Sequence, residues 1–375
     1  MHFERVLRQL WRSQVLRLWV NLWLIQLMNE FEFIRKIRKQ ADQRGASPGL
    51  VRGIGDDAAV LKSFTGTDLV VSTDLLVEGI DFRRDTTRPN QLGHKALAVS
   101  LSDIAAMGAR PRWSLLSIGV PNDVWHSGFI DNFYKGVFQI ADRFSVKLIG
   151  GDLSRTPEKI VINSIALGEC LLEREVFRSG AKPGDQIYVT GFLGDAVAGL
   201  RLIERGARLH DHNSKPTDSN AIDHLLLRHL QPEPRVGWGL LIGERQLATA
   251  MIDISDGLSS DLNHLCQESK VGALVDAHRL PIDQVVTEMC GRRALDPLML
   301  ALHGGEDFEL LFTVNPENVS KLPRRVDGIS ITLIGEIKEA SHGVRIAEGS
   351  KIWNLEPGGW EHFKSEGKSA GKANC

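Results

Sequence analysis

The spacing of hydrophobic residues along this chain predicts a mixture of helices and strands. Apolar side chains three and four positions apart are typical of helices, which we expect at residues 29–43, 92–107, 125–144, 195–205 and from 258 onward. Short apolar runs between polar or glycine-rich turns are typical of strands, which we expect at residues 58–61, 69–72, 113–120, 147–149, 160–168, 186–190, 248–254 and 308–314. Helices that alternate with strands in this way predict an α/β (α+β) protein.

The chain divides at a turn-rich segment, residues 178–185, which reads Arg-Ser-Gly-Ala-Lys-Pro-Gly-Asp. We therefore expect an N-terminal α/β domain over residues 28–168 and a C-terminal α/β domain over residues 178–363. The length of 375 residues also favours two domains. Residues 364–375 are rich in lysine, glycine and serine, a composition typical of a disordered tail.

Residues 1–27 form an N-terminal extension in which arginines alternate with leucine, valine and tryptophan. Three interpretations are open: an amphipathic helix on a membrane surface, a signal-like segment, or a stretch upstream of a true start at Met28. Arg17, Asn21 and Gln26 interrupt any apolar run long enough to cross a bilayer. We therefore expect no stable membrane insertion.

The composition narrows the function classes. Hydrophobic residues make up 42% of the chain and charged residues 25%, and the net charge of −2 argues against nucleic-acid binding. The four cysteines are scattered, without the CxxC or Cys/His spacing of a zinc site or a disulfide framework. We therefore expect a reduced, cytoplasmic enzyme whose carboxylates act as local clusters.

Aspartates at the ends of predicted strands and helices carry the candidate chemistry, and they are Asp57, Asp74, Asp103, Asp152, Asp253 and Asp256. Within residues 53–82, Asp56-Asp57 and Ser72-Thr73-Asp74 would bring hard oxygen ligands to one place. Carboxylates packed together repel unless a cation lies between them, so the set predicts several Mg²⁺ ions that bridge a polyphosphate such as ATP. For each aspartate taken singly, the alternative is a helix cap or a turn residue.

Other catalytic classes lack their motifs in this sequence. There is no Walker A motif and no protein-kinase signature set. Residues 53–58 fit a loosened dinucleotide fingerprint, but the two aspartates would face the pyrophosphate, and the gap to the next strand is too short for a crossover helix. No Gly-x-Ser-x-Gly elbow occurs, and no histidine is placed to activate a serine or cysteine. A sequence with many acidic residues and no nucleophile motif favours direct in-line phosphoryl transfer.

Seven short motifs follow one another at residues 53–61, 72–74, 96–109, 149–152, 178–185, 252–258 and 304–310. In this order they resemble the thiamine-monophosphate kinase family over nearly the whole chain. The resemblance implies the two-domain architecture shared with aminoimidazole ribonucleotide synthetase, with an N-terminal domain that dimerises. It also implies a homodimer that uses ATP and Mg²⁺ to phosphorylate thiamine monophosphate to thiamine diphosphate.

The resemblance also implies roles for individual residues. The positions that match metal ligands are Asp57, Ser72, Thr73, Asp74, Asp103, Asp152, Asp253 and Asp256. The positions that match ATP contacts are Tyr134, Gly151, Asp152, Arg178 and Ser255. The positions that match the substrate side are Asp81, Glu306 and Trp360.

The chemistry of these side chains is compatible with these roles and also with purely structural roles. The Tyr134 ring could stack on adenine and Arg178 could fork a phosphate, whereas the alternatives are a helix-face aromatic and a surface salt bridge. Glu306 and Trp360 suit a cationic thiazolium, although Trp360 could equally anchor a core. Asp81 stands where the family usually has histidine, which leaves the substrate contact there open.

Two alternative functions remain at this point. One is another ATP-dependent enzyme of the same fold, such as aminoimidazole ribonucleotide synthetase. The other is a non-catalytic nucleotide-binding relative, against which the complete set of carboxylates argues. A selenophosphate synthetase would need a reactive cysteine near the N-terminal glycine loop, and this sequence has none there.

Overall fold

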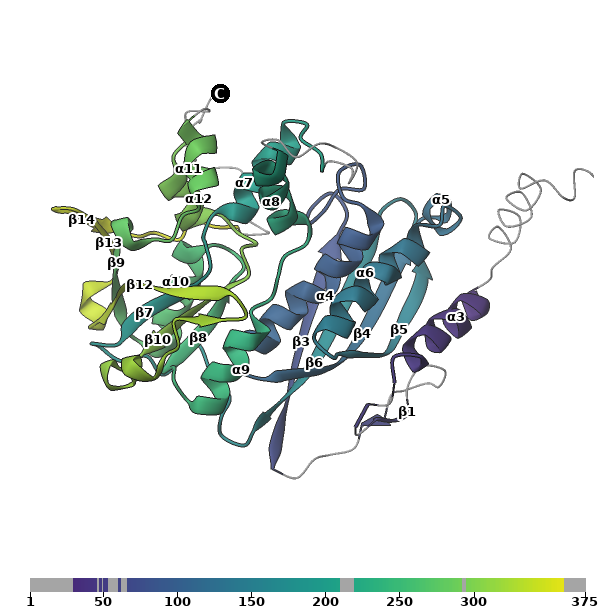
Figure 1. The fold of residues 1–375 in the computed structure, drawn as a ribbon, viewed down its shortest axis with the longest axis horizontal. Coiled ribbons are helices and arrows are strands. Elements are labelled where there is room, and N and C mark those ends of the chain that lie inside the picture. Colours follow the sequence, from purple (N-terminus) through teal and green to yellow (C-terminus); the bar gives the residue numbers. More distant parts are fainter. Residues whose placement is uncertain are drawn as a thin grey trace, which may run out of the picture. The chain divides into compact units, whose positions relative to one another are not determined.

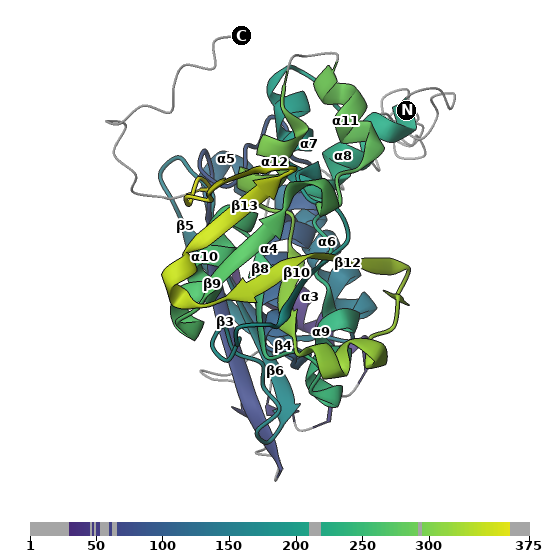
Figure 2. The same cartoon turned by 90° about the vertical axis from the view of Figure 1, so that its left-hand side faces the viewer.

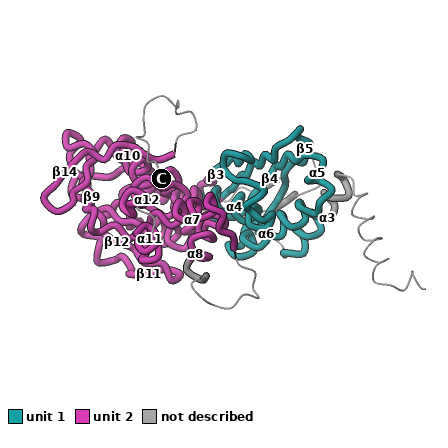
Figure 3. Tube along the Cα trace, turned by 90° about the horizontal axis from the view of Figure 1, so that it is seen from above, with its two compact units in different colours: residues 1–67, 71–100, 111–167 teal, residues 68–70, 101–110, 168–375 magenta. Residues whose placement is uncertain are grey.

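The computed structural model describes residues 30–45, 47–48, 50–52, 60–61, 66–209, 219–291 and 295–360. The chain forms two compact units, which Figure 3 colours teal and magenta. The described residues of unit 1 fall within 1–67, 71–100 and 111–167, and those of unit 2 within 68–70, 101–110 and 168–375. None of the described helices is long and apolar enough to span a membrane.

Unit 1 is built on a four-stranded sheet, in the order β3 (Thr67–Val77), β6 (Val161–Leu171), β4 (Arg110–Val120) and β5 (Lys147–Arg155). β4 and β5 pair in parallel. Buried side chains recur along β4 because successive residues of a strand point to opposite faces. Figure 1 shows α4 (Pro89–Ala106) and α6 (Phe129–Arg143) against one face of this sheet. The end of α4 and short parts of β3, β4 and β6 belong to unit 2.

The helices of unit 1 follow the predicted apolar spacing. In α4, Leu97, Leu101 and Ile104 are fully buried, and in α6 the same holds for Phe133 and Val137. The helices predicted at residues 92–107 and 125–144 are confirmed to within a few residues at their ends. Smaller elements are α3 (Glu30–Asp42), α5 (Asn122–Trp125) and an antiparallel pair of β1 (Leu50–Arg52) and β2 (Val60–Leu61).

Unit 2 contains an eight-stranded sheet. Its main path runs through β14 (Lys351–Asn354), β13 (Val344–Glu348), β9 (Gly272–Asp276), β12 (Ile329–Lys338), β7 (Gln186–Thr190), β10 (Glu309–Val314) and β8 (Ala250–Ile254), and β11 (Arg325–Val326) pairs with β12. β13 and β9 pair in parallel, whereas β10 pairs antiparallel with both β7 and β8. Figure 2 shows β13, β9 and β12 side by side.

Two hydrophobic cores stabilise unit 2. The larger core joins the sheet to α10 (Leu258–Ser269) and α12 (Pro297–His303) through residues such as Ile252, Leu262 and Leu302. The smaller core joins α7 (Asp195–Glu204), α8 (Ser219–Leu230) and α11 (Gln284–Gly291) through Leu202, Leu225 and Val286. The remaining helix is α9 (Val236–Arg245), and 3₁₀ turns lie at Ala277–Arg279, Pro316–Lys321 and Ala340–His342.

The mixed layers of helix and sheet in both units confirm the predicted α/β (α+β) class. The strands predicted at residues 186–190, 248–254 and 308–314 are β7, β8 and β10. The sequence pattern did not predict α8, α9, α11 and α12, nor β9 and β11 to β14. Helix α8 begins at Ser219.

Candidate active site

In unit 1, the predicted ligands Ser72, Thr73 and Asp74 lie on β3. Ser72 and Asp74 are half-buried and point to one face, whereas Thr73 is exposed on the other, because side chains alternate along a strand. The Ser100 hydroxyl donates a hydrogen bond of 2.7 Å to Asp74 Oδ2. Thr73 Oγ1 donates across the sheet to Asn163 Oδ1 at 2.8 Å. The Thr73 side chain therefore faces away from Asp74.

Gly151 and Asp152 lie on β5, where β4 pairs with it. A Cβ at Gly151 would overlap the carbonyl oxygen of Leu116, so this close approach requires glycine. Asp152 is exposed and stands in register with Ser117. The exposed carboxylate is accessible to a solvated cation.

Tyr134 lies on the buried side of α6, where it is 5% exposed. Its ring meets Phe133 edge to face, at 5.4 Å between centroids, and lies 6.1 Å from the ring of Phe138. Burial raises the pKa of the Tyr134 phenol. These contacts fit the alternative of a helix-face aromatic, and the adenine contact stays a prediction.

Asp81 follows β3, and its carboxylate closes the turn there. Asp81 Oδ2 accepts a hydrogen bond of 2.7 Å from the Val77 amide, and Lys95 Nζ donates to the Asp81 carbonyl at 3.2 Å. The described contacts of the side chain are therefore local to the turn. The remaining predicted ligand of this region, Asp57, lies outside the described residues, as does Asp56.

In unit 2, Asp253 lies near the end of β8 and is 3% exposed. The Ser102 hydroxyl, from the last turns of α4, donates a hydrogen bond of 2.7 Å to Asp253 Oδ2. The next residue of the helix is the predicted ligand Asp103, which is half-buried. Ser102 was not among the predicted residues. Its position next to the predicted ligand Asp103, in the motif at residues 96–109, could have identified it as a site residue.

Three loops of unit 2 meet at residues 255–257, 304–306 and 358–360, and we call them the rim loops. The Glu306 amide donates to the Ser255 carbonyl at 2.7 Å, and the Trp360 amide donates to the Asp256 carbonyl at 3.1 Å. A Cβ at Gly359 would overlap the same Asp256 carbonyl, so the Pro-Gly-Gly-Trp segment needs glycine to approach this closely. The rim loops thus bring together four predicted site residues, Ser255, Asp256, Glu306 and Trp360.

The side chains at the rim loops differ in exposure. The Trp360 side chain projects into solvent and is 56% exposed. Glu306, held at φ +67°, places its Oε2 2.9 Å from Nδ1 of the buried His229. His229 was missed because it lies on α8, which the sequence pattern did not predict. An exposed indole beside a carboxylate can bind a flat cationic ring.

Asp261 supports the first rim loop from α10 and was also missed. Its Oδ2 accepts the amides of Asp256 at 3.2 Å and Gly257 at 3.0 Å. Burial, together with the charge of Asp256, raises the pKa of Asp261 to about 7. The charge of Arg178 opposes this shift, and Arg178 itself is exposed, with its carbonyl accepting a hydrogen bond from Ser269. Burial is the larger cause of this rise in pKa, and the neighbouring charge of Asp256 adds to it.

A serine–histidine pair holds the last rim loop. Ser259 Oγ lies 2.8 Å from His303 Nδ1 and accepts the Gly358 amide at 3.2 Å. Ser259 is fully buried, which suits a structural role better than nucleophilic catalysis. The two glycines before Trp360 were the feature of the sequence that indicated a close approach of this loop to another part of the backbone.

Two family models match the chain. The model for the AIR synthase related protein, N-terminal domain, matches residues 55–170, and the model for the AIR synthase related protein, C-terminal domain, matches residues 182–348. Together they account for more than half of the chain.

Individual relatives match over almost their full length. A thiamine-monophosphate kinase from Buchnera aphidicola subsp. Schizaphis graminum is 37% identical over 339 residues, which cover 89% of this chain and 99% of that protein. The crystal structure of thiamine-monophosphate kinase from Stenotrophomonas maltophilia K279a has a TM-score of 0.74 and 39% identity, covering 85% of this chain and 96% of that one. A structure of AaThiL complexed with AMPPCP and TMP has a TM-score of 0.69 and 34% identity, covering 89% and 97% of the two chains.

Proposed function

We propose that this chain, which belongs to the thiamine-monophosphate kinase family, transfers the γ-phosphate of ATP to thiamine monophosphate and so makes thiamine diphosphate. Its 37% identity to a kinase of that name, over 99% of the relative's length, is the observation that carries the proposal. The AaThiL complex with AMPPCP and TMP supports both substrates, since AMPPCP is an analogue of ATP. The domains proposed at residues 28–168 and 178–363 are supported by the two family models.

The donor set fits Mg²⁺. Carboxylate, hydroxyl and main-chain carbonyl oxygens are hard ligands, which Mg²⁺ prefers. We assign the ions to Asp57, Ser72, Thr73, Asp74, Asp103, Asp152, Asp253 and Asp256, with Thr73 acting through its carbonyl. When bound, such ions neutralise charge on the transferring phosphoryl group.

The residues of the chain position the reactants. Ser100 holds one oxygen of Asp74, and Ser102 holds one oxygen of Asp253, so each carboxylate is oriented before any ligand arrives. In-line transfer needs no covalent intermediate, which is consistent with the absence of a nucleophile motif in the sequence. For ATP we assign Gly151, Asp152, Arg178 and Ser255, with Tyr134 as the least supported contact because it is buried.

For the acceptor we assign Glu306 and Trp360 at the rim loops. The carboxylate and the exposed indole face both attract the cationic thiazolium of thiamine monophosphate. Asp81 would repel the phosphate of that substrate, and its carboxylate already accepts the Val77 amide. We therefore assign Asp81 to the structure of the turn.

The exposed face of β3 supports a homodimer. Leu69, Val71 and Leu75 are each more than half exposed, and they alternate along the strand so that they share one face. A row of large apolar side chains on a sheet is typical of a surface that a second copy covers. Sedimentation velocity of the purified protein should give the mass of a dimer, and a monomer at micromolar concentration would contradict this assignment. We also propose that the enzyme is cytoplasmic.

An acceptor assay tests the proposed reaction. Purified protein is given MgATP with thiamine monophosphate or with thiamine, and ADP and thiamine diphosphate are measured. We expect thiamine diphosphate and equal amounts of ADP with thiamine monophosphate, and no product with thiamine. Turnover of thiamine itself, or none with thiamine monophosphate, would overturn the proposal.

A further inference from the structure

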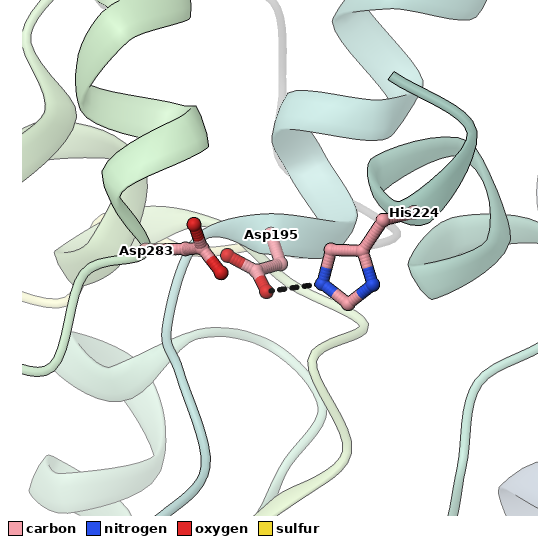
Figure 4. A group of neighbouring side chains, drawn as sticks. All are labelled: Asp195, His224 and Asp283. Atoms are coloured by element: carbon pink, nitrogen blue, oxygen red, sulfur yellow. Dashed lines mark ion pairs between the residues drawn. The ribbon is translucent and has the colours of Figure 1, made fainter. Parts of the chain in front are cut away.

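A second group of metal-ligating side chains lies in unit 2, between three helices and outside the rim loops. Asp195 is the first residue of α7, His224 lies on α8, and Asp283 immediately precedes α11. One ligand atom from each of the three lies within 4.8 Å of the others. Figure 4 shows the Asp195 carboxylate between Asp283 and His224. An imidazole with two carboxylates is a donor set that Zn²⁺ and similar ions prefer.

The buried carboxylate of Asp195 is incompletely satisfied by the described residues. Asp195 is 1% exposed, and its Oδ1 makes no hydrogen bond within the part of the chain that the structure describes. Its Oδ2 lies 3.6 Å from His224 Nε2 and 3.8 Å from Arg228 Nε, which are long distances for an ion pair. A buried carboxylate oxygen without a donor destabilises a protein unless something else binds it.

The groups that could satisfy Asp195 are engaged elsewhere. The amides at the start of α7, from Gly194 and Ala196, donate to the Asp307 carboxylate at 2.7 and 3.1 Å. The Arg228 guanidinium donates to Glu309 Oε1 at 2.7 Å and to the Asp307 carbonyl at 3.1 Å. The α7 N-terminus and Arg228 therefore serve Asp307 and Glu309, and the charge of Asp195 is left to a further cation.

Asp283 is already oriented as a ligand. Its Oδ1 accepts the Val285 amide at 2.8 Å, which fixes the carboxylate at the start of α11. His224 is half-exposed, so water can reach the group and complete the coordination of an ion.

We propose that Asp195, His224 and Asp283 bind one Zn²⁺ ion. The ion takes one ligand from each of α7, α8 and the start of α11, and these three helices share the core around Leu202, Leu225 and Val286. It neutralises the buried oxygen of Asp195 and ties α8 to its neighbours. This site is distinct from the proposed Mg²⁺ ligands because it alone contains an imidazole.

Zinc binding to the full chain tests the proposal. The protein is stripped with a chelator and dialysed against micromolar Zn²⁺ with millimolar Mg²⁺ and no ATP, so that Mg²⁺ occupies the sites made only of oxygen. We expect about one tightly bound Zn²⁺ per chain by elemental analysis, and a rise in melting temperature on adding Zn²⁺. Co²⁺ in place of Zn²⁺ should give the visible absorption of a four-coordinate site, which is stronger than that of Co²⁺ in water.

Variants locate the ion. We expect His224→Ala to lose the bound zinc and the shift in melting temperature, because it removes the nitrogen ligand from an exposed position without opening the core. His264→Ala, which removes an exposed histidine of α10, is the matched control and should keep both. If His224→Ala folds poorly, His224→Gln takes its place in the test and should likewise lose the bound zinc and the shift in melting temperature. Wild-type protein that binds no zinc, or a His224 variant that retains it, would overturn the proposal.

Discussion

Unit 2 holds two groups of acidic residues in different ways. At Glu309, which is fully buried, the contacts run through the side chain: Arg228 and Arg235 pair with the carboxylate, and Thr190 Oγ1 donates at 2.6 Å. Burial by itself would raise the pKa of Glu309, but the charges and hydrogen bonds of Arg235 and Arg228 outweigh it and lower that pKa. In the rim loops, the Asp256 amide donates to Asp261 Oδ2 at 3.2 Å and the Asp256 carbonyl accepts the Trp360 amide at 3.1 Å, so these hydrogen bonds run through the main chain.

A change of side chain therefore disturbs different contacts in the two places. Where the fold contacts a carboxylate, a change of side chain leaves buried partners without their charge. Where the fold contacts the main chain, those hydrogen bonds remain when the side chain changes.

The largest effect should come from breaking the buried group. Glu309→Gln leaves the charges of Arg228 and Arg235 uncompensated and should lower the free energy of unfolding by about 3–5 kcal/mol. Denaturant titration followed by circular dichroism measures this. Glu336→Gln, which removes an exposed pair with Lys338, is the control and should cost less than about 1 kcal/mol. Equal effects of the two changes would show that burial is not what distinguishes Glu309.

The second prediction concerns catalysis rather than folding. Asp253→Asn removes a charged metal ligand but keeps an oxygen that can accept from Ser102, so kcat should fall about a hundredfold, equivalent to about 3 kcal/mol. The melting temperature should change little. Asp296→Asn, at a helix cap where asparagine serves as well as aspartate, is the control and should leave kcat unchanged. An Asp253→Asn enzyme with full activity would contradict the metal assignment.

The third prediction concerns the substrate. Trp360→Ala should raise KM for thiamine monophosphate about tenfold, since loss of a cation–π contact costs about 1–2 kcal/mol, while KM for ATP stays the same. Steady-state kinetics with each substrate varied in turn measures this. The exposed Trp353 of β14 offers a matched control in Trp353→Ala. If Trp360→Ala raised both KM values equally, the thiazolium contact would be excluded.

The smallest effect concerns His224, which lies beside the buried carboxylate of Asp195. Interaction with the Asp195 carboxylate, 3.6 Å away, raises the pKa of the imidazole against the lowering effect of burial. Because the folded-state pKa lies above the unfolded value, the protonated pair contributes stability that is complete below about pH 6.5 and is lost as the pH rises through the folded-state pKa. An NMR titration of metal-free protein should show a lower midpoint in Asp195→Asn. Identical midpoints would contradict the pairing.

Much of the candidate site could be predicted because its residues sit in short motifs. Ser72-Thr73-Asp74, the segment at 252–258 and the segment at 304–310 each place polar atoms beside a buried run, and that pattern is local. The supporting residues could not be predicted in the same way. Asp261, His229 and Ser259 contact the rim loops from helices whose positions depend on packing. The residues next to them in the sequence do not indicate which loop each one contacts.

The sequence by itself determined the fold class, the order of the motifs and the family, because apolar periodicity and short motifs are properties of consecutive residues. Only the tertiary structure decided that Asp74 accepts a hydrogen bond from Ser100 and that Tyr134 is buried. It also decided the sheet of unit 2, in which β9 pairs with β12 and β13 from far along the chain. Which face of a strand or helix is buried, and which distant strands pair, depend on packing between segments far apart in the chain, which no local pattern records.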